Sequence, residues 1–219
     1  MVLLPKICVP IVHESQVLTT VEPIIDFYEV RIDLIGKNWR NVIKDLKKPW
    51  IACNRRVEDG GKWAGNEDKR IKELFNALDM GAPLVDIELG TPAVDKIVKE
   101  VKGLASIIIS YHNLEKTPPL EKLQQIVTNQ LAAGADICKV VTTARSTYDN
   151  TIVLKLIKHF PEARIIAFAM GINGQISRLL CPLVGGYFTW ASSEQGNESA
   201  SGQIPAEELR HFYRMMGDQ

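Results

Sequence analysis

The sequence predicts an α/β protein that folds as a single (β/α)8 barrel, the TIM-barrel architecture. Three observations predict it: eight short β-type runs recur along the 219 residues, segments with helical apolar spacing separate them, and no low-complexity linker divides the chain. We therefore expect residues 1–219 to form one domain, although the length alone would also permit two. A doubly wound parallel sheet is the alternative fold.

The eight predicted strands are short runs rich in apolar residues. They are Lys6 to Val12, Phe27 to Leu34, Pro49 to Arg55, Leu84 to Leu89, Ser106 to Asn113, Ile137 to Thr143, Ala163 to Met170 and Tyr187 to Ser192. Apolar residues at helical spacing follow the second run, between 39 and 46, and the last run, between 209 and 216. Because strands and helices alternate, we expect a parallel sheet with helical crossovers.

The composition is that of an ordinary globular chain and excludes several classes of partner. Lys plus Arg and Asp plus Glu number 26 each, so there is no basic excess for binding nucleic acid. No apolar stretch approaches the roughly 20 residues of a membrane span, so no membrane association is expected. The N-terminus lacks an export signal and the four cysteines are far apart, so we expect reduced core cysteines and a cytoplasmic location.

Charged residues occupy an unexpected face of the second predicted strand. Side chains alternate faces along a strand, so Glu29, Arg31 and Asp33 share one face, opposite an apolar face. The apolar face must meet the helices. The three charged side chains are therefore predicted to point into the barrel, where Val, Ile and Leu normally predominate.

The same reasoning turns further polar residues of the third to sixth strands inward. These residues are Arg55, Asp86, Glu88, Ser110, His112 and Lys139. Isolated buried charges are costly, so they must be paired or used in function. Asp33 and Asp86 are the best candidates for purely structural partners of the arginines. The group as a whole indicates a functional site rather than a structural ion-pair network.

Lys139 lies within an apolar strand, a setting that favours a particular chemistry. Burial and neighbouring arginines disfavour the ammonium form and free the amine to form a Schiff base, whereas nearby carboxylates act in the opposite direction. The sequence leaves the sign of the resulting change in the pKa of Lys139 open. His112 is predicted on the neighbouring strand at the same end of the barrel, where it could act as acid and base.

Three loops follow strands at this end of the barrel. Residues 56–66 form a polar, glycine-bearing loop, and residues 170–178 bring Arg178 near a helix N-terminus, which suits a substrate carboxylate or phosphate. Residues 191–203 are rich in Ala, Ser and Gly, and we predict a mobile lid there.

Six segments, in order along the chain, carry a resemblance to one known family. They are Glu29-Val30-Arg31-Ile32-Asp33; Arg55 with Asp59-Gly60-Gly61; Ser110-Tyr111-His112-Asn113 with Lys116-Thr117-Pro118; Gly134-Ala135-Asp136-Ile137-Cys138-Lys139; Met170, Gly174, Ile176, Ser177 and Arg178; and Ser199-Ala200-Ser201-Gly202-Gln203-Ile204. Together they resemble type I 3-dehydroquinate dehydratase, the Schiff-base enzyme family of the shikimate pathway.

The resemblance implies that the chain converts 3-dehydroquinate to 3-dehydroshikimate and water by syn elimination. Lys139 would form an iminium with the C3 ketone, while His112 would assist, remove the C2 proton and protonate the departing C1 hydroxyl. The iminium is the electron sink, so neither a metal nor an organic cofactor is expected. Family members are often dimers, and by resemblance we expect a homodimer.

The resemblance also implies the substrate contacts. Arg178, with Ser199 and Gln203 from the lid, would hold the substrate carboxylate. The charged strand residues would bind ring hydroxyls and order the imine site; they are Glu29, Arg31 and Arg55. The supporting residues would be Asp59, Glu88, Met170 and Trp190.

Three residues depart from the family pattern. Asp59 replaces a glutamate, so its reach toward His112 is shorter and its orienting role is an open question. Ser201 replaces a lid proline, which should leave the closed lid less preorganised. Trp190 replaces a phenylalanine and keeps an aromatic wall.

Two other functions stay open at this point. A class I Schiff-base aldolase would also use a barrel lysine, with Arg178 on a phosphate, although no obvious glycine-rich phosphate loop follows the eighth strand. A catalytically silent barrel acting as a binding subunit is the non-enzymatic alternative, and the intact pair of Lys139 and His112 argues against it.

Overall fold

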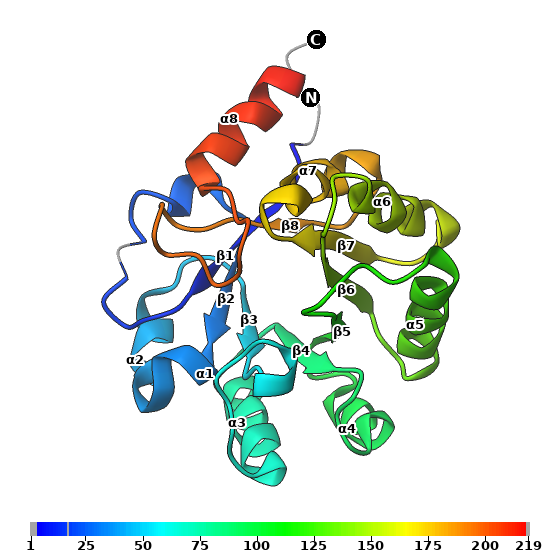
Figure 1. Cartoon of the computed structure of the whole chain (residues 1–219). Helices are drawn as coiled ribbons and strands as arrows, with labels where there is room; N and C mark the ends of the chain where they lie inside the picture. Colours follow the sequence, from blue (N-terminus) through cyan, green and yellow to red (C-terminus); the bar gives the residue numbers. More distant parts are fainter. Residues whose placement is uncertain (1–3, 17, 218–219) are drawn as a thin grey trace.

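The computed structural model describes residues 4–16 and 18–217, which form a nearly closed barrel of parallel strands surrounded by helices (Figure 1). The strands are β1 (Ile7–Ile11), β2 (Phe27–Arg31), β3 (Trp50–Cys53), β4 (Leu84–Glu88), β5 (Ser106–His112), β6 (Ile137–Thr143), β7 (Ile165–Met170) and β8 (Thr189–Trp190). Their order in the sheet is β7-β6-β5-β4-β3-β2-β1-β8. The predicted barrel is confirmed, and the doubly wound alternative is wrong.

The seam of the barrel lies between β7 and β8. The two-residue strand β8 pairs with β1 in parallel register, Ile7 with Thr189 and Cys8 with Trp190. Immediately before β8, the Tyr187 N–H donates to the Ile165 carbonyl of β7 at 2.8 Å. This hydrogen bond holds the two edges of the sheet together at the seam.

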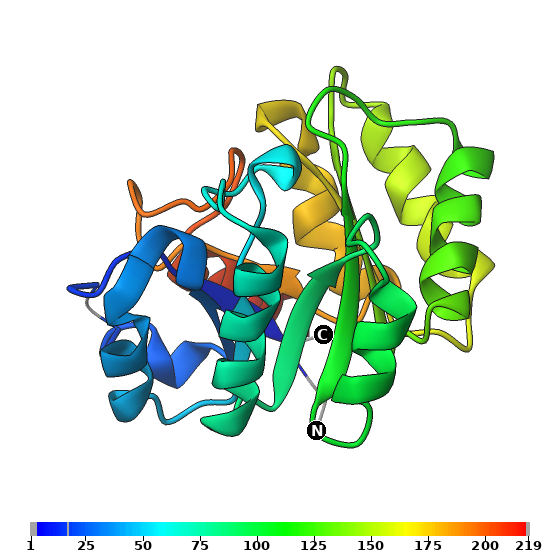
Figure 2. The ribbon, with the colours of Figure 1, turned by 90° about the horizontal axis from the view of Figure 1, so that it is seen from below.

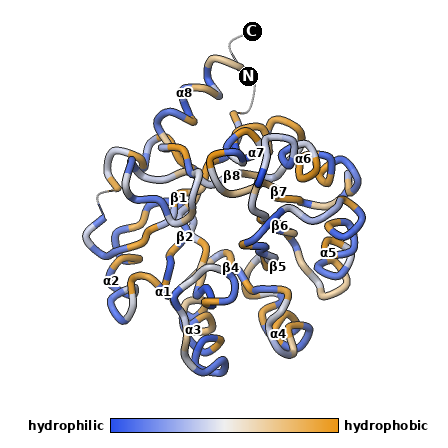
Figure 3. Tube along the Cα trace, viewed as in Figure 1, coloured by the Kyte–Doolittle hydropathy of each residue, from blue (hydrophilic) through white to orange (hydrophobic). Residues whose placement is uncertain are grey.

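The helices pack around the outside of the barrel, as the side view shows (Figure 2). They are α1 (Ile32–Ile35), α2 (Trp39–Val42), α3 (Glu67–Asp79), α4 (Val94–Val101), α5 (Leu120–Ala132), α6 (Asp149–His159), α7 (Gln175–Leu180) and α8 (Ala206–Gly217). Each longer helix alternates hydrophobic and hydrophilic positions, which suits one face on the sheet and one in solvent (Figure 3). None of the helices in the described ranges has the length and apolarity needed to cross a membrane.

The second predicted strand is shorter than expected. β2 ends at Arg31, and the predicted strand residues Ile32 to Leu34 belong to α1 instead. The Arg31 guanidinium donates to the Asp33 carboxylate at 2.9 and 2.7 Å, and the Lys62 N–H donates to the same carboxylate at 3.0 Å. These bonds hold Asp33 at the end of the strand as the partner of Arg31, so it does not continue the inner face.

The other predicted strands differ from the structure only at their ends, and the helix predicted after β2 is irregular. The run between 39 and 46 forms α2 and a 3-10 turn, Ile43–Asp45, instead of one continuous helix. The eighth run contracts to Thr189–Trp190. Cys8, Cys53, Cys138 and Cys181 are buried and free, in line with the prediction from their spacing.

The interior of the barrel contains an apolar layer and a charged layer. The apolar layer is a cluster of inward-facing side chains: Cys8, Ile51, Leu84, Ile108, Ile137, Val141, Ile166, Phe168, Phe188 and Trp190. The charged layer consists of Glu29, Arg31, Arg55, Asp86, Glu88 and Lys139, each at most 5% exposed. In Figure 3 hydrophilic stretches accordingly interrupt the strands near the centre of the barrel. The charges inside the barrel form the floor of the site described next.

Candidate active site

A cavity opens at the carboxyl ends of the strands, above the charged layer. Of the residues assigned above to catalysis, substrate contacts and support, only Glu88 is absent from its lining, which contains Glu29, Arg31, Arg55, Asp59, His112, Lys139, Met170, Arg178, Trp190, Ser199 and Gln203. A barrel enzyme carries its active site at this end, because the loops that follow the strands meet there. The geometry therefore brings residues far apart in the sequence to one candidate active site.

Lys139 extends from β6 into the centre of this site. Its Nζ lies 2.9 Å from Asp86 Oδ2, 3.3 Å from Glu29 Oε1 and 3.9 Å from the centroid of the Trp190 ring. Burial by itself would lower the pKa of Lys139, but the carboxylates of Asp86 and Glu29 outweigh burial and raise the pKa above its ordinary value. The sequence left the direction of the change in the pKa of Lys139 open, and the structure shows that the pKa is raised. In the free protein Lys139 is an ammonium ion that must lose a proton before it can attack a carbonyl.

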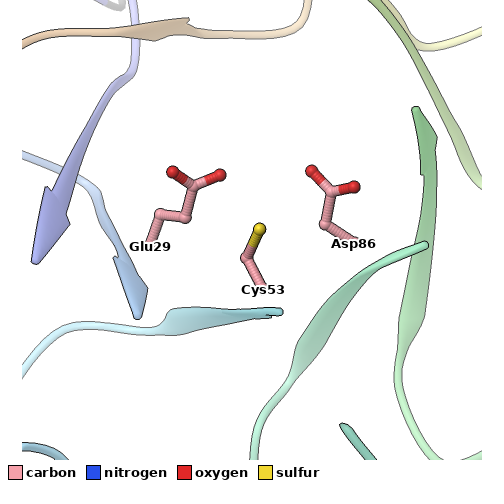
Figure 4. Close-up of side chains that lie close together, drawn as sticks. All are labelled: Glu29, Cys53 and Asp86. Atoms are coloured by element: carbon pink, nitrogen blue, oxygen red, sulfur yellow. The ribbon is translucent and has the colours of Figure 1, made fainter. Parts of the chain in front are cut away.

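The side chains of Glu29, Cys53 and Asp86 converge on one another (Figure 4), and both carboxylates contact Lys139. Their possible ligand atoms lie within 4.8 Å of one another, which is a spacing that a metal site could have. The Lys139 ammonium already binds both carboxylates, and burial raises the pKa of the Cys53 thiol well above its ordinary value. The three side chains therefore fit a lysine cation better than a metal ion.

Asp86 is the centre of a hydrogen-bonded network. Arg55 donates to Asp86 Oδ2 at 2.6 Å, to Glu88 Oε1 at 2.8 Å and to Ser110 Oγ at 2.7 Å, and the Ser110 hydroxyl donates to Asp86 Oδ1 at 2.6 Å. Burial by itself would raise the pKa of Asp86, but the charges of Arg55 and Lys139 outweigh burial and lower the pKa below its ordinary value. The carboxyl is therefore ionised. Asp86 pairs with Arg55, as expected of a partner of the arginines, and it also binds Lys139 directly.

Glu88 lies behind Arg55 and does not reach the cavity. Its second carboxylate oxygen accepts a hydrogen bond from Arg70 on α3 at 2.7 Å. The sequence analysis missed Arg70. A signal for it existed, since Arg70, Leu74 and Ala77 share the buried face of α3 at helical spacing, and a charge in such a stripe needs a partner.

His112 projects from the end of β5 toward the same cavity. Its Nδ1 is 3.7 Å from Asp59 Oδ1, which is longer than a hydrogen bond, and this buried nitrogen has no hydrogen-bond partner among residues 4–16 and 18–217. Asp59 is held by Arg56, which donates to Asp59 Oδ2 at 2.6 and 3.1 Å. Burial, followed by the charge of Arg55, lowers the pKa of His112 to about 3. The imidazole is therefore neutral and able to accept a proton.

Arg178 reaches the cavity from α7 on the opposite, aromatic side. Its guanidinium carbon lies 4.2 Å from the centroid of the Phe168 ring, and its Nε and Nη2 are buried with no hydrogen-bond partner in the part of the chain that the structure describes. Burial lowers the pKa of Arg178 to about 10, so the group is still a cation. A buried cation with unused donors is suited to binding an anionic ligand.

The segment predicted as a lid folds over the mouth of the cavity. The Gln203 carboxamide accepts from the Ser199 N–H at 2.8 Å and donates to the Ser199 hydroxyl at 3.1 Å. The Gly171 N–H donates to the Ser201 carbonyl at 3.1 Å, which ties the lid to the loop after β7. Ser199 and Gln203 thus line the cavity from the lid side.

Several lining residues were not predicted from the sequence. They are Gly60, Leu114, Val141, Phe168 and Ala200. The strand alternation of β6 and β7 could have identified Val141 and Phe168, since both face inward. Leu114 and Ala200 lie in loops, where no periodicity marks the direction of a side chain.

The family model, two sequence relatives and a solved structure that resemble this chain all point to one family. The model of the type I 3-dehydroquinase family matches residues 7–219. A 3-dehydroquinate dehydratase of Dehalococcoides mccartyi is 44% identical over 188 residues, 86% of this chain and 85% of that protein, and one of Methanocaldococcus jannaschii is 36% identical over 96% of this chain and 98% of that protein. The solved structure of 3-dehydroquinate dehydratase from Geobacillus kaustophilus matches with a TM-score of 0.83 and 26% identity, over 97% of this chain and 91% of that one. The predicted resemblance is confirmed, and the chain belongs to the type I 3-dehydroquinase family.

Proposed function

We propose that this chain, as a single catalytic domain over residues 1–219, dehydrates 3-dehydroquinate to 3-dehydroshikimate through an imine on Lys139. Family membership supports the reaction. The observation that supports the role of Lys139 most directly is its position, with Nζ at the cavity floor between the Glu29 and Asp86 carboxylates and the Trp190 ring.

The first half of the reaction forms the imine. Lys139 gives up a proton, its amine attacks the C3 carbonyl carbon, and the carbinolamine loses water to leave an iminium. The neutral imidazole of His112 accepts and returns protons in these steps. Because the lysine nitrogen is a cation both before the reaction and in the iminium, Asp86 and Glu29 have a counter-ion in both of these states. The charged layer therefore has the same net charge in the free protein and in the iminium.

The second half eliminates water. The iminium draws electrons from the adjacent C2–H bond, His112 accepts that proton, and an enamine forms. The resulting imidazolium then protonates the C1 hydroxyl on the same face. The protonated hydroxyl departs as water, and the electrons of the enamine restore the iminium. Asp59, 3.7 Å from His112 Nδ1, stabilises the transient imidazolium. Hydrolysis of the imine releases the product and restores Lys139.

The substrate is held between the two sides of the cavity. Arg178 binds its carboxylate with Nε and Nη2, which have no partner in the described part of the chain, assisted by Ser199 and Gln203 of the lid. Glu29, Arg31 and Arg55 face the ring hydroxyls. The supporting residues are Asp59, Glu88, Met170 and Trp190.

A homodimer is part of the proposal. Three large apolar side chains are exposed at the start of α6 and the start of α7: Tyr148 (67% exposed), Ile172 (76%) and Ile176 (46%). The two segments are joined by a hydrogen bond from the Asn150 side chain to the Asn173 carbonyl at 2.6 Å. Such an exposed apolar group is typical of a protein interface. Light scattering should give twice the mass of the 24.5 kDa chain, and a monomer mass would contradict the proposal.

Borohydride trapping tests the imine. Incubation with 3-dehydroquinate and borohydride should reduce the iminium to a stable adduct, which peptide mass spectrometry assigns to Lys139. Lys139→Ala should form no adduct and lose at least about 10⁴-fold in turnover. His112→Ala should still form the adduct slowly, while its turnover falls about 10²- to 10⁴-fold.

Sugar phosphates are the matched control for the trapping experiment. An adduct on Lys139 with a sugar phosphate and none with 3-dehydroquinate would replace the proposal with an aldolase. No adduct with either compound, and no acceleration of dehydration, would leave a barrel without this chemistry.

A further inference from the structure

Arg70 is a completely buried arginine on an outer helix, and it contacts the charges inside the barrel. Its side chain has 0% exposure. Nη1 donates to Glu88 Oε2 at 2.7 Å and to the Asn54 carbonyl at 3.0 Å, and Nη2 donates to Thr91 Oγ1 at 2.9 Å and Glu67 Oε1 at 2.7 Å. Asn54 follows β3 and Thr91 follows β4, so the guanidinium is fixed at the ends of these two strands.

A continuous series of hydrogen bonds leads from Arg70 to Lys139. Glu88 accepts from Arg70 on one oxygen and from Arg55 on the other, at 2.7 and 2.8 Å. Arg55 donates at 2.6 Å to Asp86 Oδ2, the same oxygen that accepts from Lys139 Nζ at 2.9 Å. Arg55 and Lys139 thus share one carboxylate oxygen.

Glu88 is shared by two arginines, Arg55 and Arg70, and Asp86 is shared by Arg55 and Lys139. Arg70 is therefore the second cation on Glu88, the carboxylate that competes with Asp86 for Arg55. Without Arg70, Arg55 would be the only cation on Glu88 and would be drawn away from Asp86. Asp86 would then bind the Lys139 ammonium more strongly, and the free amine would be rarer at neutral pH.

We propose that Arg70 is a positioning residue for the dehydration: by holding Glu88, it leaves Arg55 on Asp86 and thereby keeps Lys139 able to release its proton. The inference rests on the proposed function, since it concerns the proton that Lys139 must lose. Arg70 itself touches neither the cavity nor the substrate.

Arg70 makes no hydrogen bond to any of the titratable or charged groups around Lys139 in the described ranges. Those that face the lysine from the neighbouring strands and their ends are Cys8, Glu29, Cys53, Arg55, Asp86 and His112. Arg178 of α7 faces Glu29, and Arg31 is paired with Asp33. Of these, only Arg55 has a partner, Glu88, in common with Arg70. The effect of Arg70 on Lys139 therefore passes through Glu88 and Arg55.

The pH dependence of kcat/KM tests this inference. In Arg70→Met the acid limb, where Lys139 gains its proton, should move to higher pH by up to about one unit, with a loss of about 3- to 10-fold at neutral pH. Arg70→Lys keeps the cation and should restore part of the shift. Glu88→Gln should move the limb to lower pH. The double variant Arg70→Met/Glu88→Gln removes one charge of each sign and should return the limb toward the wild-type position.

Arg210 provides the matched control. It is also a buried arginine on an outer helix, α8, but its guanidinium donates to the Ile24 and Pro5 carbonyls and to Asp26. Arg210→Met should lower the free energy of unfolding and leave the pH profile unchanged. A folded Arg70→Met with the wild-type profile would overturn the inference, as would a double variant shifted as far as Arg70→Met. If Arg70→Met does not fold, an unshifted Glu88→Gln would overturn it. Failure of the wild-type protein to trap substrate on Lys139 would instead overturn the proposed function.

Discussion

Arg55 and Arg178 are both buried and line the same cavity, but their guanidinium groups are in opposite states. Arg55 donates to Asp86, Glu88 and Ser110. Burial would lower its pKa, but the carboxylates raise it well above the ordinary value. Arg178 lies over Phe168, two of its nitrogens have no hydrogen-bond partner within the described residues, and burial lowers its pKa to about 10. The charged side of the cavity is thus complete without a ligand, whereas the aromatic side holds a cation whose donors are left for one.

Replacing each arginine with methionine should distinguish the two arginines by their effects on kcat/KM and on the free energy of unfolding. These are the largest effects that we predict from this comparison. Arg178→Met should lower kcat/KM at least about 100-fold, because each hydrogen bond between charged groups contributes about 1.5–3 kcal/mol. It should leave the free energy of unfolding unchanged or higher, since an unpaired buried cation is removed. Arg55→Met should lower that free energy by about 3–5 kcal/mol, because Asp86 and Glu88 lose a buried partner.

Urea unfolding and steady-state kinetics on the two variants provide the comparison. Equal losses of stability in both would show that the Arg178 donors are satisfied in the free protein. The contrast between the two sides of the cavity would then be wrong.

The pKa of His112 on the charged side of the cavity can be tested by the pH dependence of the free energy of unfolding. The pKa of His112 is about 3 in the folded protein and 6.5 for an ordinary histidine, so between these values the unfolded chain binds a proton that the folded chain does not. This group therefore contributes less stability as the pH falls below 6.5. Between about pH 7 and about pH 5 its share of the loss should be about 1–2 kcal/mol.

The measurement is urea unfolding of the wild-type protein and His112→Asn at these two pH values. The variant should lose less stability on acidification than the wild type. If both lose the same amount, burial and the charge of Arg55 do not lower the pKa of His112 in the folded protein.

Strand periodicity predicted much of this site, because the pleat of a strand alone decides which side chains face inward. It oriented Glu29, Arg31 and Lys139 correctly, and it identified His112. Periodicity failed where tertiary contacts override it. Asp33 lies outside the strand, where its carboxylate binds Arg31, whereas Asp86 faces inward as predicted and binds Lys139 as well as Arg55.

The remaining contributions to the site could not be predicted from local sequence. Arg70 reaches Glu88 only because α3 lies against the ends of β3 and β4, and the position of a helix on a sheet is not encoded in its own spacing. Ser199 and Gln203 came from the family resemblance alone. Their lid has no periodicity, and its hydrogen bonds to Gly171 and within itself fix their direction.

The smallest effect we predict concerns this lid, which is tied to the aromatic side of the cavity through Gly171. The Ser201 carbonyl accepts the Gly171 N–H, while the Ser201 N–H donates no hydrogen bond within the described residues. A proline at this position would therefore lose no bond and would restrict the open lid, a gain of about 0.4–1 kcal/mol for the closed form. Ser201→Pro should lower KM for 3-dehydroquinate roughly two- to fivefold. Ser201→Ala keeps the backbone freedom and should leave KM unchanged, because the Ser201 side chain is exposed. Equal KM values for the two variants would show that ordering of the lid does not limit the binding of the substrate carboxylate by Arg178.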